Sequence, residues 1–174
     1  GHDCPLVRVD IDGAELGEPP AQLPILGDAA AFLAALSEAV GPGRSAWSAE
    51  EVASARARWR AEVDAERPGI VPLCDALAEV LPADAMVFSD MTQFAYVAKE
   101  VVDMPAPGLW HHPFGFGTLG YALPAAIGGK VGRPNRPVLA IAGDYGLQFT
   151  VQELATAVEL GLSLPVLLWD NGKL

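Results

Sequence analysis

Polar residues end three apolar runs of this sequence, and their types could support metal chemistry. The endings are Ser89–Asp90, Gly143–Asp144 and Asp170–Asn171. Asp144 and Asn171 stand 27 positions apart, which leaves room for one loop, one helix and one strand. In a parallel sheet, such a crossover brings the second strand back beside or near the first. Both side chains can therefore emerge at the same edge of a sheet.

A carboxylate and an amide oxygen at one edge are hard ligands, suited to Mg²⁺ or Ca²⁺. Mg²⁺ usually keeps several non-protein ligands, and phosphate oxygens are common among them. The alternative is structural: Asp144 caps the following helix, and Asn171 occupies a turn because Asp-Asn-Gly is a strong turn sequence. Spacing alone does not decide between a metal site and a cap with a turn.

A glycine-rich segment raises a different hypothesis. Residues 115–120 read GFGTLG, which matches GxGxxG and precedes a predicted helix. A dinucleotide-dependent oxidoreductase is therefore considered, with Asp144 as the acidic residue at the end of the next strand. Against it, Pro113 interrupts the preceding segment, whereas the dinucleotide fingerprint sits directly on a strand end. A purely structural glycine turn is the remaining interpretation.

The elements that would position these residues alternate regularly after residue 69. We expect helices at 70–82, 92–102, 119–132 and 150–161, strands at 85–90, 137–144 and 164–171, and a short extended segment at 108–112. This pattern predicts an α/β fold with a doubly wound parallel sheet and helices on both faces. Ligands bind at the carboxyl ends of the strands in such sheets.

The first part of the chain has a different organisation. Residues 6–12 alternate as a strand does, and residues 27–40 have helical spacing with Asp28 as N-cap. A helix over 48–66 opens with a capping box of Ser48 and Glu51, and its Glu/Arg-rich surface is expected to face solvent. The glycines of residues 41–44 indicate a boundary. We predict three parts: residues 1–43, a linker helix at 44–68, and a domain at 69–174.

Composition limits the classes of partner. The chain has 174 residues, 51% hydrophobic and 19% charged, so it is globular, and its net charge of −11 argues against nucleic acid and anionic membranes. No apolar run approaches the roughly 18 residues of a membrane helix, and the first residues of the sequence lack the basic and apolar regions typical of a signal peptide. A soluble cytoplasmic protein is expected. Cys4 and Cys74 lack CxxC spacing and are predicted to be reduced packing residues.

Other conspicuous side chains are assigned structural roles. His111 and His112 are adjacent, so on an extended backbone they point to opposite faces and make a poor metal site. One of them could face a substrate, but a loop role is favoured. Trp47, Trp59 and Trp110 are predicted to be packing residues.

Three blocks, in order, resemble thiamin-diphosphate-dependent enzymes. Residues 143–173, GDYG to DNGK, resemble the family's signature, a Gly-Asp-Gly opening and an Asn-Asn-like close at this separation. GFGTLGYALPAAIGGK resembles a block of the acetolactate synthase and 2-oxoacid decarboxylase branch. VRVDIDGAELG with ILGDAAAFLAAL resembles the end of that branch's middle domain. The resemblance implies the end of a middle domain, then an incomplete thiamin-diphosphate-binding fold.

The resemblance implies a cofactor and the residues that hold it. Mg²⁺ would be bound by Asp144, Asn171 and the backbone carbonyl of Lys173, and it would hold the diphosphate of thiamin diphosphate. Gly143, Tyr145 and Gly146 would present backbone groups to the phosphates.

The other end of the cofactor would lie on the glycine-rich segment. Gly117 would offer its carbonyl to the 4′-amino group, Thr118 lies next in the chain, and Leu119 would be the bulky residue that forces the bent cofactor conformation. Gln93 stands where the family resemblance places a glutamine that contacts the diphosphate region. The next position, where the synthases often have His, is Phe94 here.

Two positions depart from the family's pattern. Tyr145 stands where the signature has its second Gly, and Tyr adopts a left-handed backbone less easily than Gly. Asp170 replaces the first Asn of the usual pair and adds negative charge near the metal. Within the branch, GDYG with WDNGKL is most similar to 5-guanidino-2-oxopentanoate decarboxylases.

The implied activity is decarboxylation of a small 2-oxoacid with release of an aldehyde, the cofactor acting as electron sink. Acetolactate synthase-like carboligation and a non-catalytic assembly domain are the alternatives. The family also implies a homodimer or homotetramer with the active site between subunits. Its activating glutamate belongs to another domain, so we expect no catalytic residue here, a longer natural polypeptide, and an isolated chain that is inactive.

Overall fold

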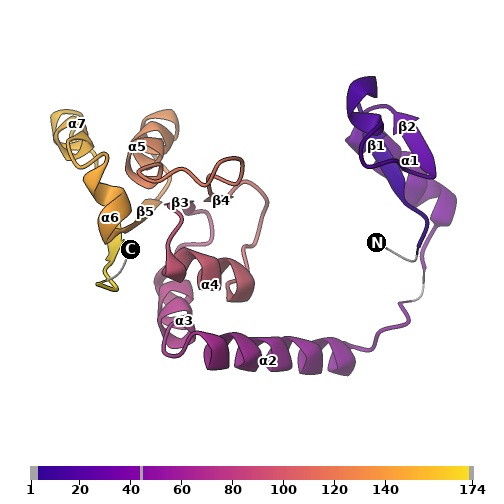
Figure 1. The fold of residues 1–174 in the computed structure, drawn as a ribbon, viewed down its shortest axis with the longest axis horizontal. Coiled ribbons are helices and arrows are strands. Elements are labelled where there is room, and N and C mark those ends of the chain that lie inside the picture. The colour runs from indigo at the N-terminus through magenta and orange to yellow at the C-terminus, as the bar shows by residue number, and fades with distance from the viewer. Residues whose placement is uncertain (1–3, 44, 173–174) are drawn as a thin grey trace. The chain divides into compact units, whose positions relative to one another are not determined.

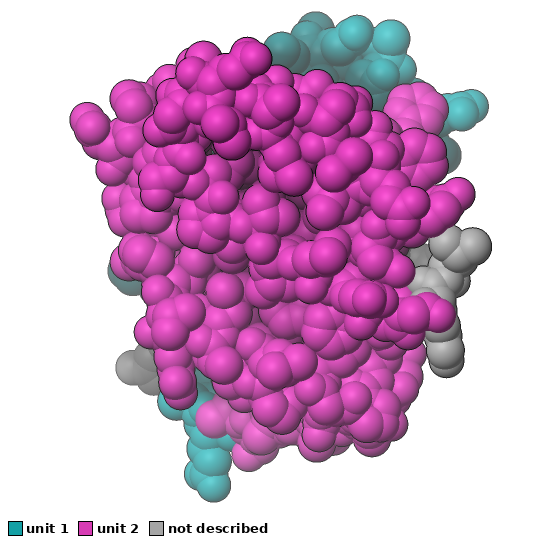
Figure 2. All heavy atoms as spheres, turned by 90° about the vertical axis from the view of Figure 1, so that its left-hand side faces the viewer, with its two compact units in different colours: residues 1–52 teal, residues 53–174 magenta. Residues whose placement is uncertain are grey.

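The computed structural model describes residues 4–43 and 45–172 of the chain. It divides into two compact units, Gly1–Val52 and Ala53–Leu174 (Figures 1 and 2). The assignment of residues 1–43 to a middle domain and of 44–68 to a linker stays a prediction. The four-stranded sheet and the polar strand endings belong to the second unit.

The first unit is built on two parallel strands and one helix. The elements are β1 (Val7–Asp10), the 3₁₀ helix η1 (Gly13–Leu16), β2 (Leu23–Leu26) and α1 (Ala29–Val40). Asp28 caps α1 as predicted, since its Oδ1 accepts the N–H of Ala31 at 2.8 Å. The sequence did not predict β2, because four residues that include Pro24 give no clear alternation.

Helix α2 (Ala49–Glu66) begins with the predicted capping box. The N–H of Glu51 donates to Ser48 Oγ at 3.1 Å, and the N–H of Ser48 donates to Glu51 Oε2 at 2.7 Å. These bonds satisfy two N–H groups that a helix start otherwise leaves without partners.

Three arginines of the segment after α2's first turn form ion pairs with later parts of the chain, so its polar surface is only partly a solvated face. The pairs are Arg56 with Asp103, Arg60 with Asp75, and Arg67 with Glu100. Arg60 also donates to the carbonyl of Val101 at 3.0 Å. The segment therefore contacts its neighbours through these ion pairs and through Val63, which packs against a hydrophobic core of the second unit. The packing roles predicted for Trp47 and Trp59 were wrong, because their exposed fractions are 69% and 59%.

The second unit contains a four-stranded parallel sheet. Its strands are β3 (Met86–Ser89), β4 (Trp110–His111), β5 (Val138–Gly143) and β6 (Val166–Trp169), in the order β4-β3-β5-β6. Its further helices are α3 (Val71–Val80), α4 (Gln93–Val101), α5 (Ala122–Gly132), α6 (Asp144–Gln148) and α7 (Glu153–Glu159). Every element expected after residue 69 is present with slightly different ends. The short helix α6 was not expected.

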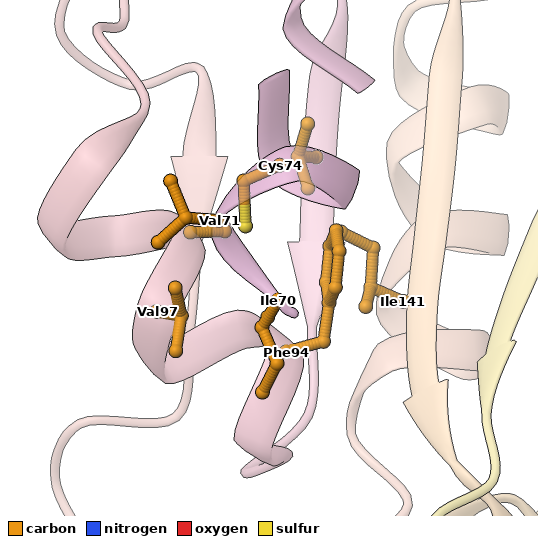
Figure 3. Packing of buried hydrophobic residues seen from close by; sticks show 8 residues of the cluster. Ile70, Val71, Cys74, Phe94, Val97 and Ile141 are labelled. Carbon is orange, nitrogen blue, oxygen red and sulfur yellow. The ribbon is translucent and has the colours of Figure 1, made fainter. Parts of the chain in front are cut away.

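Both faces of the sheet are covered, which confirms the doubly wound α/β prediction. On one face of the sheet, Val87 of β3 and Ile141 of β5 pack against α3, α4 and the turn before α3 (Figure 3). The residues that these helices and the turn contribute to this core are Ile70, Val71, Cys74, Phe94, Val97 and Ala98. The neighbouring strand residues face the other way. They are Met86, Phe88 and Ala140, and they pack against Ala126 of α5. Figure 1 shows α5 and α7 on one side of the strands and α3 and α4 on the other. Strand alternation thus fills two cores.

The two cysteines have different environments, and both are free thiols. Cys74 is fully buried between α3 and the sheet, and burial raises the pKa of its thiol to about 11. Cys4 is exposed, so the packing prediction was right for Cys74 and wrong for Cys4. Within the described ranges, no helix has the length and apolar character needed to cross a membrane.

Two adjacent glycines of α5 provide a matched test of the core on β3. A Cβ on Gly129 would lie 2.5 Å from the Phe88 ring, whereas a Cβ on Gly128 would meet nothing within 4 Å. Because Phe88 is confined between α5 and the His111 ring, Gly129→Ala should destabilise the fold by about 1–2 kcal/mol. Gly128→Ala should stabilise it by up to about 1 kcal/mol. Urea unfolding midpoints measure both, and equal shifts would contradict this packing.

Candidate functional site

The carboxyl ends of β3, β5 and β6 open onto one cavity of about 410 Å³. Its lining residues come from the last residues of β5 and β6, from the segments that follow the three strands and from the loop before α5: Met91, Thr92, Gln93, Tyr96, Leu119, Gly143, Asp144, Tyr145, Gly146, Trp169 and Asn171. The cavity therefore lies where ligands bind in parallel α/β sheets.

Asp144 and Asn171 are brought together by the pairing of β5 with β6. Gly143 lies opposite Trp169 in this parallel ladder, so Asp144 follows one strand end directly and Asn171 lies two residues beyond the other. Both line the cavity. The helix-cap alternative does not hold for Asp144, because Asp144 is the first residue of α6 and the N-cap is Gly143.

The predicted turn is present, but Asp170 makes it. Asp170 Oδ1 accepts the N–H of Gly172 at 2.8 Å, and Gly172 has a φ of 61°. The turn and the cavity-lining position of Asn171 thus coexist. The carboxylate that departs from the family's Asn-Asn pattern is engaged in this turn.

Tyr145 fits its position without backbone strain. In the described part of the chain, every residue with positive φ is a glycine, and Tyr145 lies inside α6. Its ring meets the Phe149 ring edge-on at a centroid distance of 5.3 Å. A left-handed backbone is therefore not required at the third residue of GDYG.

The glycine-rich loop reaches the cavity through one of its predicted residues. Leu119 lines the cavity, whereas Gly117 and Thr118 do not. Gly117 has a φ of 63°, and a Cβ there would lie 3.2 Å from Cε of the cavity residue Met91. Thr118 is exposed, so no cavity contact supports its prediction.

The remaining predicted positions divide between cavity, core and the undescribed end. Gln93 lines the cavity. Phe94 is buried, and its ring lies 5.5 Å from that of Trp169, so its role is packing. Lys173 lies outside the described residues.

Asp90 is a buried carboxylate beside the cavity, and the sequence marked it only as a polar strand ending. Its exposed fraction is 1%. Its Oδ1 accepts the N–H of Ala122 at 2.7 Å, and its Oδ2 accepts the N–H of Gly120 at 3.2 Å. Burial raises the pKa of Asp90, and the amide hydrogen bonds oppose that shift. The signal available in the sequence was a carboxylate directly after an apolar strand.

The two histidines point to opposite faces of β4 and its extension, as predicted. The ring of His111 stacks on that of Phe88 with centroids 4.5 Å apart. His112 is buried, with its Nδ1 2.9 Å from Ser89 Oγ, which also accepts the indole N–H of Trp110 at 2.9 Å. Trp110 is therefore a structural residue, as expected. Burial and, to a smaller extent, the Lys99 charge lower the pKa of His112.

Comparison with known proteins identifies the family. Residues 90–174 match the family described as thiamine pyrophosphate enzyme, C-terminal TPP binding domain. The chain belongs to the thiamine pyrophosphate enzymes. The cofactor of this family is thiamin diphosphate. GFGTLG also lacks the dinucleotide geometry, since residues 112–114 separate Gly115 from the end of β4 and α5 begins only after Gly120. The dinucleotide hypothesis was wrong.

Curated relatives cover nearly the whole chain. "Probable 2-ketoarginine decarboxylase AruI" of Pseudomonas aeruginosa is 45% identical over 175 residues, which span 97% of this chain and 31% of the relative. The acetolactate synthase large subunit of Corynebacterium glutamicum is 35% identical over 183 residues, 99% of this chain and 29% of the relative. The chain thus spans about 30% of the length of these two relatives.

A solved structure shares the fold. The thiamine diphosphate-dependent 4-hydroxybenzoylformate decarboxylase of Rhodococcus jostii RHA1 superposes with a TM-score of 0.71 at 21% identity. The match covers 97% of this chain and 31% of that chain. It confirms the thiamin-diphosphate-binding fold predicted from the motifs.

The buried His112 predicts a pH-dependent stability. Because its pKa in the folded chain is below 6.5, the unfolded chain takes up the proton first as pH falls. The stabilisation that comes from keeping His112 neutral is complete above about pH 6.5, and it is lost as the pH falls toward the pKa of His112 in the folded chain. His112→Asn can retain a bond to Ser89 without titrating, so its melting temperature should fall less between pH 8 and about pH 5.5. Parallel pH profiles of the two proteins would contradict this.

Proposed function

We propose that the chain is the thiamin-diphosphate- and Mg²⁺-binding part of a 2-oxoacid decarboxylase that releases an aldehyde. The observation that carries this proposal is the meeting of Asp144 and Asn171 on one cavity, at the ends of two paired strands of a thiamine pyrophosphate enzyme. The bound cofactor would supply an electron sink for loss of CO₂. The chain's own residues bind it, orient it and limit access of water.

Magnesium fits the donor set at the strand ends. Asp144 offers a carboxylate and Asn171 an amide oxygen, and we assign the third protein ligand to the backbone carbonyl of Lys173. Hard oxygen donors suit Mg²⁺, which takes further ligands from phosphate and water. Gly143, Tyr145 and Gly146 line the same cavity at the start of α6, where backbone N–H groups have no intrahelical acceptor. The diphosphate would lie between these groups and the metal.

The loop before α5 would receive the other end of the cofactor. Leu119 lines the cavity and would support the bent conformation, while the Gly117 carbonyl would accept from the 4′-amino group. Gln93 also lines the cavity, and we propose that it contacts the diphosphate region. Thr118 lies between Gly117 and Leu119, and its side chain is exposed. We therefore propose that it belongs to the cofactor site only as part of this loop.

The substrate we propose is 5-guanidino-2-oxopentanoate, which is 2-ketoarginine. The support is the 45% identity to the Pseudomonas aeruginosa relative, compared with 35% to the acetolactate synthase. Carboligation of the acetolactate synthase type is the second candidate, supported by that synthase and several others among the relatives.

We also propose a homodimer or homotetramer in which another subunit completes the site. Two large aromatic side chains of the cavity-flanking loop support this: Phe116 is 100% exposed and Phe114 is 75% exposed. Exposed aromatic groups of this size beside a binding site are typical of surfaces that a partner covers.

The free thiols of Cys4 and Cys74 suit a reducing cytoplasm, which is the location we propose.

Removal of the acidic ligand tests the metal site. In the full-length protein, Asp144→Ala should weaken Mg²⁺-dependent binding of thiamin diphosphate by roughly 100-fold or more, since losing even an outer partner of a metal ligand costs 10–100-fold. Isothermal titration calorimetry with and without Mg²⁺ measures this. Asp103→Ala is the matched control, because it removes the same charge from an exposed ion pair outside the cavity. Equal affinity in Asp144→Ala and the wild type would exclude this metal site.

A product assay separates the candidate activities. The full-length protein, supplied with thiamin diphosphate and Mg²⁺, should release CO₂ and an aldehyde from 5-guanidino-2-oxopentanoate faster than it condenses pyruvate to acetolactate. Predominant acetolactate formation would favour the synthase alternative. A folded full-length protein that does not bind thiamin diphosphate would instead be a non-catalytic assembly protein.

A further inference from the structure

We propose that Asp90 is a positioning residue that fixes the separation between the two ends of the cofactor site. This inference rests on the proposed function, because it concerns the distance between the Gly117–Leu119 loop and the α6 end of the cavity. Asp90 contacts segments of both ends and does not itself line the cavity.

The first contact is with the beginning of α5. Ala122 donates its N–H to Oδ1 at 2.7 Å, Gly120 donates to Oδ2 at 3.2 Å, and the N–H of Tyr121 also favours the charged carboxylate. The N-cap position of α5 is Tyr121, which makes no side-chain capping bond. Asp90 therefore caps this helix from a different part of the chain, and it holds the last residue of the glycine-rich loop.

The second contact is with α6. A Cβ built on Gly146 would lie 2.7 Å from Asp90 Oδ2 and 3.6 Å from the Gly120 nitrogen. The carboxylate, the loop end and the α6 backbone are thus packed together with no room for a side chain between them. Gly146 is part of the segment that lines the diphosphate side of the cavity.

The backbone of Asp90 is itself fixed to the sheet. Its N–H donates to the Ile141 carbonyl of β5 at 2.8 Å, and its own carbonyl accepts from Thr92 at 3.0 Å. The carboxylate therefore extends from a rigid support. Burial of the Asp90 carboxylate costs free energy that its hydrogen bonds must offset. A local side chain at the N-cap position 121 could cap α5 without this cost, so capping alone does not require a buried carboxylate on another segment.

The functional consequence follows from the size of the ligand. Thiamin diphosphate is expected to contact both ends of the cavity, so its affinity depends on a separation set before binding. Inorganic pyrophosphate with Mg²⁺ can contact only the metal and α6 side. A change in Asp90 should therefore weaken the long ligand and spare the short one.

The test uses Asp90→Asn in the full-length protein, which preserves size and removes the charge. We expect the affinity for thiamin diphosphate with Mg²⁺ to fall by roughly 10–100-fold, as for outer groups that orient a binding site. The affinity for pyrophosphate with Mg²⁺ should stay within about twofold. Titration calorimetry gives both values. Asp28→Asn is the matched control, since Asp28 caps α1 through an equivalent carboxylate bond at 2.8 Å; it should leave both affinities unchanged.

A purely structural role predicts a different outcome. Equal loss of both affinities, or no loss of either, would overturn the inference. If Asp90→Asn fails to fold by thermal melting, Asp90→Glu keeps the charge and the cap but adds one methylene between β3 and the two segments. It should show the same selective loss, and unchanged binding of both ligands would overturn the inference. A folded wild-type protein that binds neither ligand would refute the proposed function first.

Discussion

The parallel pairing of β5 with β3 and β6 is the constraint on which the site depends. It aligns three strand ends at one edge of the sheet, so that polar residues separated by many positions line one cavity. Strand alternation supplies the support for this edge, because successive residues of β3 and β5 enter the cores on opposite faces. The edge is therefore held by two packed layers, and its position does not rely on loop conformation alone.

Much of this arrangement could be predicted from sequence because its signals are local and periodic. Apolar runs of strand length marked β3, β5 and β6, and the 27-position spacing correctly predicted that Asp144 and Asn171 emerge at the same edge of the sheet. The misses have physical causes. Helix α6 is too short for a periodic pattern, and β2 is a short strand containing a proline. The exposure of Trp59 depends on which surfaces lie over α2, which residue type cannot specify.

The site was harder to predict where contacts are non-local. Gln93 and Leu119 were found from a family resemblance and do line the cavity, but Thr118 in the same motif faces solvent. Asp90 had no motif, since its partners Gly120 and Ala122 lie about 30 residues away and act through backbone N–H groups that carry no residue-specific signal. His112 likewise contacts Ser89 only because the pairing of β3 with β4 brings these two parts of the chain together. Such tertiary contacts require coordinates.

The backbone of GDYG separates two requirements that a letter pattern combines. Position 145 has ordinary helical geometry and an exposed side chain, so the fold accepts a large aromatic residue there. Position 146 is different, because any side chain would collide with the Asp90 carboxylate. A sequence search that insists on glycine at the third letter would thus discard chains able to form the same turn into α6. A filter based on the fourth letter and its buried acidic neighbour would describe the physical requirement better.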